Sequence, residues 1–178
     1  MDFKELIKIR QSDRKYEDRA VEREKLEQAL EAGRLAPSAN NAQGWTFVVA
    51  DGESKKQLNE AMYRMGGSFA AQAPVAIALV AEKPIFAQRL GSLIRKIDFA
   101  SLDMGIAAAH ICLQAADLGL GTCMIESFDE KKAKKILNIP ENRRIALLIP
   151  FGYSADKQRD KKRKEFNKIV KWNKYNNE

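Results

Sequence analysis

An unbroken apolar run at residues 75–81, with the sequence VAIALVA, constrains the fold of this chain more than any other feature. A short run of this composition is typical of a β-strand whose side chains are buried on both faces of a sheet. Residues Ile145 to Phe151 form a second such run, and the β-branched and aromatic residues Thr46 to Ala50 predict a further strand. The chain is therefore expected to fold around a β-sheet.

Apolar residues at helical spacing predict helices between and around these strands. Ser54 and Asp129 are suited to cap the N-termini of two of them. The longest helix is rich in alanine, and we interpret it as a central core helix or as a subunit contact. Residues 84–96 are the least interpretable stretch, and we interpret them as a mobile surface segment. The predicted helices run from Asp2 to Ile9, from Val21 to Ala36, from Ser54 to Tyr63, from Asp98 to Leu118 and from Asp129 to Leu137.

The length of 178 residues and the hydrophobic content of 45% predict a single domain that spans residues 1–178. The formal net charge is +7, and part of the excess is local, because residues 157–164 hold six cations and one acid. Such a run suggests nucleic acid, an anionic membrane surface or a phosphorylated small ligand as its partner. Since the run contains no aromatic residue, we expect no nucleic-acid binding.

Cysteine, histidine and hydropathy patterns limit the location and the chemistry. Cys112 and Cys123 lie in apolar surroundings, and the chain shows no signal-peptide pattern, which predicts the reducing cytoplasm. The longest membrane-span candidate, residues 105–116, is shorter than the roughly 20 residues required, so we expect no membrane association. His110 is the only histidine, which argues against histidine-dependent triads and His/Cys zinc sites.

Two segments are rich in groups that could contact a ligand. Residues 35–45 (LAPSANNAQGW) place small and amide side chains between a helix that Pro37 ends and a strand. In an extended chain, Arg10, Ser12 and Arg14 leave on the same side and could surround one anion. The alternatives are an ordinary helix-to-strand connection for the first segment and a solvated charged turn for the second.

Together these features suit an enzyme whose cofactor carries the chemistry. Flavin mononucleotide (FMN) fits physically, because its phosphate needs cations and its ring needs amide partners and apolar faces. The residues alone do not distinguish a flavin from other phosphorylated ligands. The Gly119-Leu120-Gly121 turn is not a dinucleotide fingerprint, since it lacks the third glycine and precedes a strand.

The chain resembles the FMN-dependent nitroreductases in four segments, which occur in the order expected for that family. These segments are residues 10–14, 37–45, 118–129 and 161–163. The resemblance assigns the phosphate to the first arginine and serine of the N-terminal segment and to the C-terminal basic run, and the flavin pyrimidine edge to Arg14. It implies that the backbone of Glu126 and Ser127 faces flavin N5. Gly44 stands where the family commonly has proline, and residues 66–67 lack polar flavin contacts found in longer members. The cofactor-binding residues implied in this way are Arg10, Gln11, Ser12, Arg14, Pro37, Ser38, Ala39, Asn41, Gln43, Ile125, Glu126, Ser127, Lys161 and Arg163.

The resemblance also implies an architecture. The expected fold is α+β, a three-layer α/β/α sandwich with a mixed central sheet, assembled as an intertwined homodimer with two FMN molecules at the interface. The tail, residues 165–178, has few apolar anchors of its own and is expected to pack on the partner subunit and extend its sheet.

The implied reaction is hydride transfer from NADH or NADPH through flavin N5 to a small-molecule acceptor such as a nitroaromatic or a quinone. Donor and acceptor would react in turn, and no side chain is assigned a catalytic role. The alternatives are other flavin chemistry on the same fold, namely dehalogenation, dehydrogenation or flavin fragmentation, or a flavin-binding, redox-sensing module without turnover.

Overall fold

The computed structural model describes residues 1–62, 67–84 and 86–175. In this part of the chain the sheet has the strand order β1-β2-β4-β3, and all its strand pairs are antiparallel. An isolated bridge between Ser12 and Thr122 is parallel, so the mixed character that we expected is limited to this bridge among the described residues. The strands are β1 (Trp45–Ala50), β2 (Val75–Ala81), β3 (Gly121–Thr122) and β4 (Arg144–Gly152).

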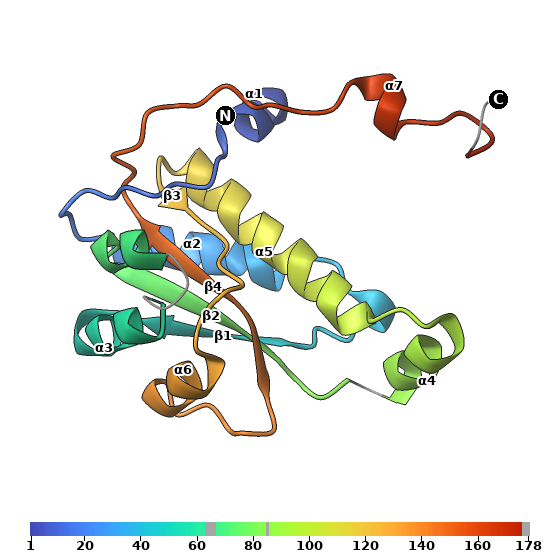
Figure 1. Cartoon of the computed structure of the whole chain (residues 1–178), viewed down its shortest axis with the longest axis horizontal. Coiled ribbons are helices and arrows are strands. Elements are labelled where there is room, and N and C mark those ends of the chain that lie inside the picture. Colours follow the sequence, from blue (N-terminus) through green and yellow to red (C-terminus); the bar gives the residue numbers. More distant parts are fainter. Residues whose placement is uncertain (63–66, 85, 176–178) are drawn as a thin grey trace.

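Helices cover both faces of the sheet, which confirms the predicted three-layer α/β/α sandwich (Figure 1). Helices α2 (Arg23–Arg34) and α5 (Phe99–Asp117) pack on one face, and α3 (Gly52–Met62) and α6 (Glu130–Ile136) pack on the other. Ile77 belongs to the first core and Ala78 to the second, because successive strand side chains point to opposite faces. Strand β2 is therefore buried on both faces, as its continuous apolar run predicted.

The ends of α5 and α6 follow from local chemistry. Asp98 accepts a hydrogen bond from the Ser101 N–H at 3.2 Å, and Asp129 accepts one from the Lys132 N–H at 3.0 Å. These contacts begin α5 and α6, and the second confirms the predicted Asp129 cap. Gly119, with a φ of +77°, follows the end of α5, where the Leu120 N–H reaches the Ala115 carbonyl at 2.8 Å in a Schellman motif.

Two predictions about the helices were wrong. Ser54 does not cap α3, because the helix begins at Gly52 and the Ser54 hydroxyl donates back to the Asp51 carbonyl at 2.8 Å. The predicted end of this helix at Tyr63 lies outside the described residues. No helix was predicted in residues 84–96, which we interpreted as a mobile surface segment, but they contain the helix α4 (Phe86–Arg95). Its apolar side chains face outward, with Phe86 79% and Leu93 78% exposed.

Helix α5 has two apolar faces. Met104, Ala108 and Ile111 are buried against α2 and the sheet, whereas Leu102 is 54% and Ile106 is 36% exposed on the opposite face. The helix is thus a core helix that also presents a second, uncovered apolar face. By length and composition α5 could cross a membrane, and it is longer than the span predicted at residues 105–116. The core helix of a soluble protein can have the same length and composition.

Both ends of the chain lie on the side of the molecule where α5 ends (Figure 1). The amino group of Met1 pairs with Asp117 at 2.8 Å, and α1 (Phe3–Ile9) packs against α5. The C-terminal segment leaves β4, passes α1, forms the short helix α7 (Phe166–Ile169) and continues beyond it. Its large apolar side chains are exposed, with Phe166 at 66% and Trp172 at 71%.

Candidate cofactor site

The N-terminal box, residues 10–14, and the C-terminal basic run, residues 157–164, lie against each other. The Arg14 N–H donates to Asp156 at 2.6 Å, and the Arg159 guanidinium donates to the Ser12 carbonyl. The Lys161 ammonium donates to the Ile7 carbonyl at 2.6 Å, near the C-terminal end of α1, where a cation is favoured. Segments separated by almost the whole chain therefore form one surface.

This surface gathers cations. Partial burial, together with the positive charges of Arg10 and Arg163, lowers the pKa of Lys161. The contacts of Lys161 with Ile7, of Arg159 with Ser12 and of Arg14 with Asp156 bring the cations of the two segments to one surface. Arg10 also lines a cavity of about 230 Å³ with Gln11 and Gln158, beside the end of α5. The carboxylates of Asp13 and Asp156 line the same cavity, and both are hydrogen-bonded within the protein. The cations beside the cavity fit an anionic group such as a phosphate.

Arg14 lies at the edge of the same surface. Its guanidinium carbon is 5.9 Å from the centre of the Phe69 ring, within the range of a cation–π contact. Phe69 belongs to the 3₁₀-helix η3 (Gly67–Gln72), and Gln72 accepts a hydrogen bond from the Tyr16 N–H at 3.3 Å. The η3 segment therefore supports the N-terminal box. Residues 63–69 were considered for contacts with the flavin pyrimidine edge. Of these, residues 63–66 lie outside the described residues.

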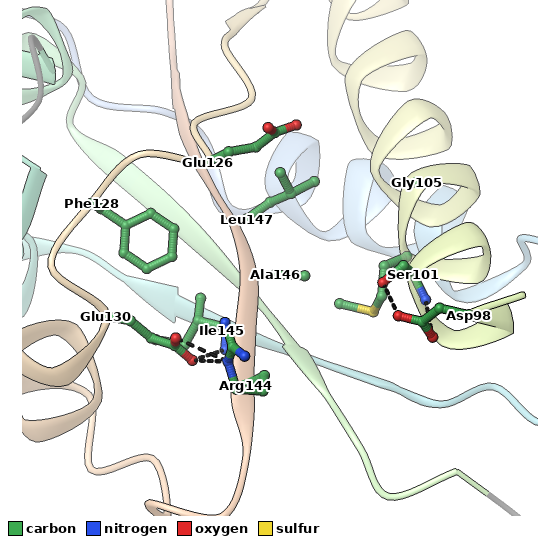
Figure 2. A pocket seen from close by; sticks show the side chains of 11 residues that line it. Asp98, Ser101, Gly105, Glu126, Phe128, Glu130, Arg144, Ile145, Ala146 and Leu147 are labelled. Atoms are coloured by element: carbon green, nitrogen blue, oxygen red, sulfur yellow. Dashed lines mark hydrogen bonds and ion pairs between the residues drawn. The ribbon is translucent and has the colours of Figure 1, made fainter. Parts of the chain in front are cut away.

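The segment after β3 extends this surface toward a larger cavity. Ile125 is buried and forms an antiparallel bridge with Leu148, whereas Glu126 and Ser127 are exposed. A cavity of about 620 Å³ lies between this segment, β4 and the N-terminal half of α5. Figure 2 shows Glu126 at one end of the cavity and the Arg144–Glu130 ion pair, with an N–O distance of 2.9 Å, at the other. This volume is in the usual range for a ligand pocket.

The amide-rich loop has the strained backbone of a built binding segment. Asn40, Asn41 and Gln43 all have positive φ angles, of 55°, 51° and 47°. Such angles are uncommon for residues other than glycine and cluster where a ligand contact compensates for the strain. The Ser38 hydroxyl accepts from the Gln43 N–H at 2.9 Å and holds the turn closed. Pro37 and Asn41 are exposed, and Ala39 is half-buried.

One chain does not bring this loop to the cations. The Ala39 N–H donates to Asp103 at 3.0 Å, near the start of α5, whereas Arg10 shares its cavity with Ala116, near the end of α5. At 1.5 Å per helical residue, these two positions on α5 are about 20 Å apart. The N-terminal box and the C-terminal basic run thus meet within one chain, and Thr122 of the third predicted segment forms a bridge with Ser12. Glu126 and residues 37–43 lie toward the other end of α5.

Comparison with known proteins identifies the family. The model of the nitroreductase family matches residues 7–66 and 62–153. The chain belongs to the nitroreductase family. Its fold is that of an FMN-dependent nitroreductase from Clostridium difficile R20291, with a TM-score of 0.80 and 32% identity over 96% of this chain and 98% of that one.

Two relatives of this nitroreductase-family chain carry different names. An oxygen-insensitive NADPH nitroreductase of Helicobacter pylori is 29% identical over 83% of this chain and 84% of its own. A protein of Thermus thermophilus named NADH dehydrogenase is 28% identical over 97% of this chain and 96% of its own. The family of flavin-dependent NAD(P)H oxidoreductases is therefore established for this chain.

The structure adds contacts that the sequence patterns did not reveal. Arg159 and Asp156 connect the two cation-bearing segments, with 3.7 Å between their charged atoms, and neither was predicted as a site residue. The basic run was a signal for Arg159, but six similar side chains in that run could not be told apart without the backbone path. Gln11 was predicted to contact the cofactor, and its amide bonds to Asp13, to the Lys157 carbonyl and to the Arg159 N–H.

Proposed function

We propose that this nitroreductase-family protein is an FMN-dependent NAD(P)H oxidoreductase that reduces nitroaromatic, quinone or related small acceptors. The observation that carries the proposal is the contact between the N-terminal box with Arg10 and the C-terminal basic run with Lys161, which come from opposite ends of the chain and form one surface. Mutual repulsion makes such a cluster unfavourable unless an anion neutralises it. A flavin phosphate supplies that anion, and Ser12 adds a hydroxyl in the same segment.

Bound FMN would supply the hydride chemistry, and the protein would bind, orient and tune it. Arg14 would lie at the pyrimidine edge and stabilise negative charge there, and the backbone of Glu126 and Ser127 would donate to the flavin ring. The cavity beside Glu126 offers space for a donor and an acceptor in turn. No acid side chain is needed, because solvent can protonate the product.

We further propose that the active unit is a homodimer in the cytoplasm. The loop of residues 37–43 lies about 20 Å along α5 from the cations of its own chain. A two-fold axis across the uncovered face of α5 would carry the loop of one subunit to the cations of the other. The exposed side chains Phe166, Ile169 and Trp172 of the tail would then be covered by the partner.

The absorption spectrum of the purified protein tests the proposal. We expect flavin bands that bleach on anaerobic addition of NADH or NADPH and return on addition of a nitroaromatic or a quinone. Arg10→Ala should raise the Kd for FMN by about 10- to 100-fold, since a charge-assisted contact contributes about 1.5 to 3 kcal/mol. Lys131→Ala, on the exposed surface of α6, is the control and should bind like the wild type. A colourless protein that takes up no added FMN would contradict the proposal.

A further inference from the structure

The side chain of Gln11 joins the two segments that carry the proposed phosphate contacts. Its Oε1 accepts the Arg159 N–H at 3.1 Å, and its Nε2 donates to the Lys157 carbonyl at 3.2 Å. These two backbone groups flank Gln158. In a parallel β-bridge the backbone of one residue bonds in the same way to the two neighbours of its partner, so the Gln11 amide replaces a strand residue in this pairing.

A buried carboxylate fixes the orientation of this amide. Gln11 Nε2 also donates to Asp13 Oδ1 at 3.0 Å. Asp13 is 6% exposed and accepts further hydrogen bonds from the Ser154 hydroxyl at 2.6 Å and from the Thr122 N–H at 3.3 Å. Because the carboxylate only accepts, the NH₂ group of Gln11 must face it. The amide oxygen is then left for Arg159.

We infer that Gln11 is a positioning residue, which sets the path of the C-terminal segment so that Lys161 and Arg163 reach the phosphate site beside Arg10. The inference rests on the proposed function and assigns Gln11 an indirect role. Like charges on the two segments repel one another, so hydrogen bonds between the segments must hold them together before an anion arrives. Gln11 supplies two of these bonds, two and four residues before Lys161 in the chain.

A double-mutant cycle on FMN affinity tests this role. Gln11→Met keeps the length of the side chain and removes all three hydrogen bonds of the amide, and it should raise the Kd for FMN by on the order of tenfold. In a Lys161→Ala/Arg163→Ala background the same change should have less than about a twofold effect, because the cations that Gln11 positions are absent. Gln57→Met, on the exposed surface of α3, is the matched control and should leave the Kd unchanged. Equal effects of Gln11→Met in both backgrounds would overturn the inference, since they indicate a direct contact with the cofactor.

A second readout needs no FMN. Trypsin should cut the apo Gln11→Met protein within residues 157–164 at least about fivefold faster than the wild type, whereas Gln57→Met should be cut at the wild-type rate. Equal cleavage of Gln11→Met and wild type would overturn the inference. If the wild type took up no FMN, the proposed function would fail, and the cleavage rates would still decide whether Gln11 holds the C-terminal segment.

Discussion

Lys55 shows how a single buried charge can make stability depend on pH. Lys55 is 3% exposed, and its ammonium group donates hydrogen bonds to the Ala70 carbonyl at 2.9 Å and to the Asn59 side chain. Among the residues that the structure describes, no carboxylate forms an ion pair with it. Burial lowers the pKa of Lys55 from 10.5 to about 8. Ala70 belongs to η3, which supports Arg14 through Phe69, so Lys55 also anchors the segment beneath the proposed flavin site.

We predict that the wild type gains stability relative to Lys55→Met as the pH rises. The lowered pKa means that the unfolded state binds more protons between about pH 8 and about pH 10.5, so the free energy of unfolding increases over this interval. Between about pH 7.5 and pH 10 the gain should be roughly 2 kcal/mol. Urea unfolding of both proteins at the two pH values measures it. A difference between the two proteins that does not change with pH would show that Lys55 is not perturbed.

At the scale of elements, the contact between α2 and α5 depends on one missing side chain. A Cβ atom on Gly33 would lie 2.6 Å from Ile111 Cγ1 and 3.1 Å from Phe47 Cζ, both on side chains of the core that α2, α5 and the sheet share. Glycine therefore lets α2 approach α5 closely, although it disfavours the helix itself.

The predictions at this scale were best where the apolar pattern was strongest. Strand β2 has the predicted bounds, and β4 exceeds its prediction by one residue at each end.

Gly33→Ala should lower the free energy of unfolding by about 1 to 2 kcal/mol. Overpacking costs typically 1 to 3 kcal/mol, and the higher helix propensity of alanine returns up to about 1 kcal/mol. Chemical denaturation of the apo protein measures the change. Gly44→Ala is the control, because no heavy atom lies within 4 Å of its added Cβ, and it should be close to neutral. A stabilised Gly33→Ala protein would show that α2 can move away from α5 at no cost.

At the scale of the whole molecule, we consider three places among the described residues where apolar surface remains uncovered. These are the outer face of α5 with Leu102 and Ile106, the outer face of α4 with Phe86 and Leu93, and the tail with Trp172. Contiguous exposed apolar surface usually marks an interaction site. Helix α4 packs beside the amide-rich loop. The uncovered face of α4 therefore borders residues 37–43, which lie far from the cations of the same chain. The homodimer that we propose would cover this surface and complete the site together.

Ile106→Glu should therefore convert a dimer to a monomer and release FMN. The side chain is 36% exposed and points away from the core of its own chain, so the fold should persist by circular dichroism. A carboxylate buried without a partner in the interface should weaken association by about 100-fold or more. Analytical ultracentrifugation and the flavin absorbance measure the two effects. Asn142→Glu, in an exposed turn, adds the same charge and should stay dimeric with its flavin. A dimeric, yellow Ile106→Glu protein would place the interface elsewhere.

The sequence by itself determined the elements whose signal is local. Continuous apolar runs and capping side chains act over a few residues, which is why β2, β4 and α6 were predicted closely. Helix α4 was missed although Phe86, Leu90, Leu93 and Ile94 recur at helical spacing, because Gly91 and Ser92 weaken the pattern and no core residue marks its buried side. Only the tertiary structure decided that Arg10 meets Lys161 and that residues 37–43 lie apart from both. These positions depend on the path of the backbone between segments that are almost the whole chain apart. Side chains within a few residues of each segment do not determine that path.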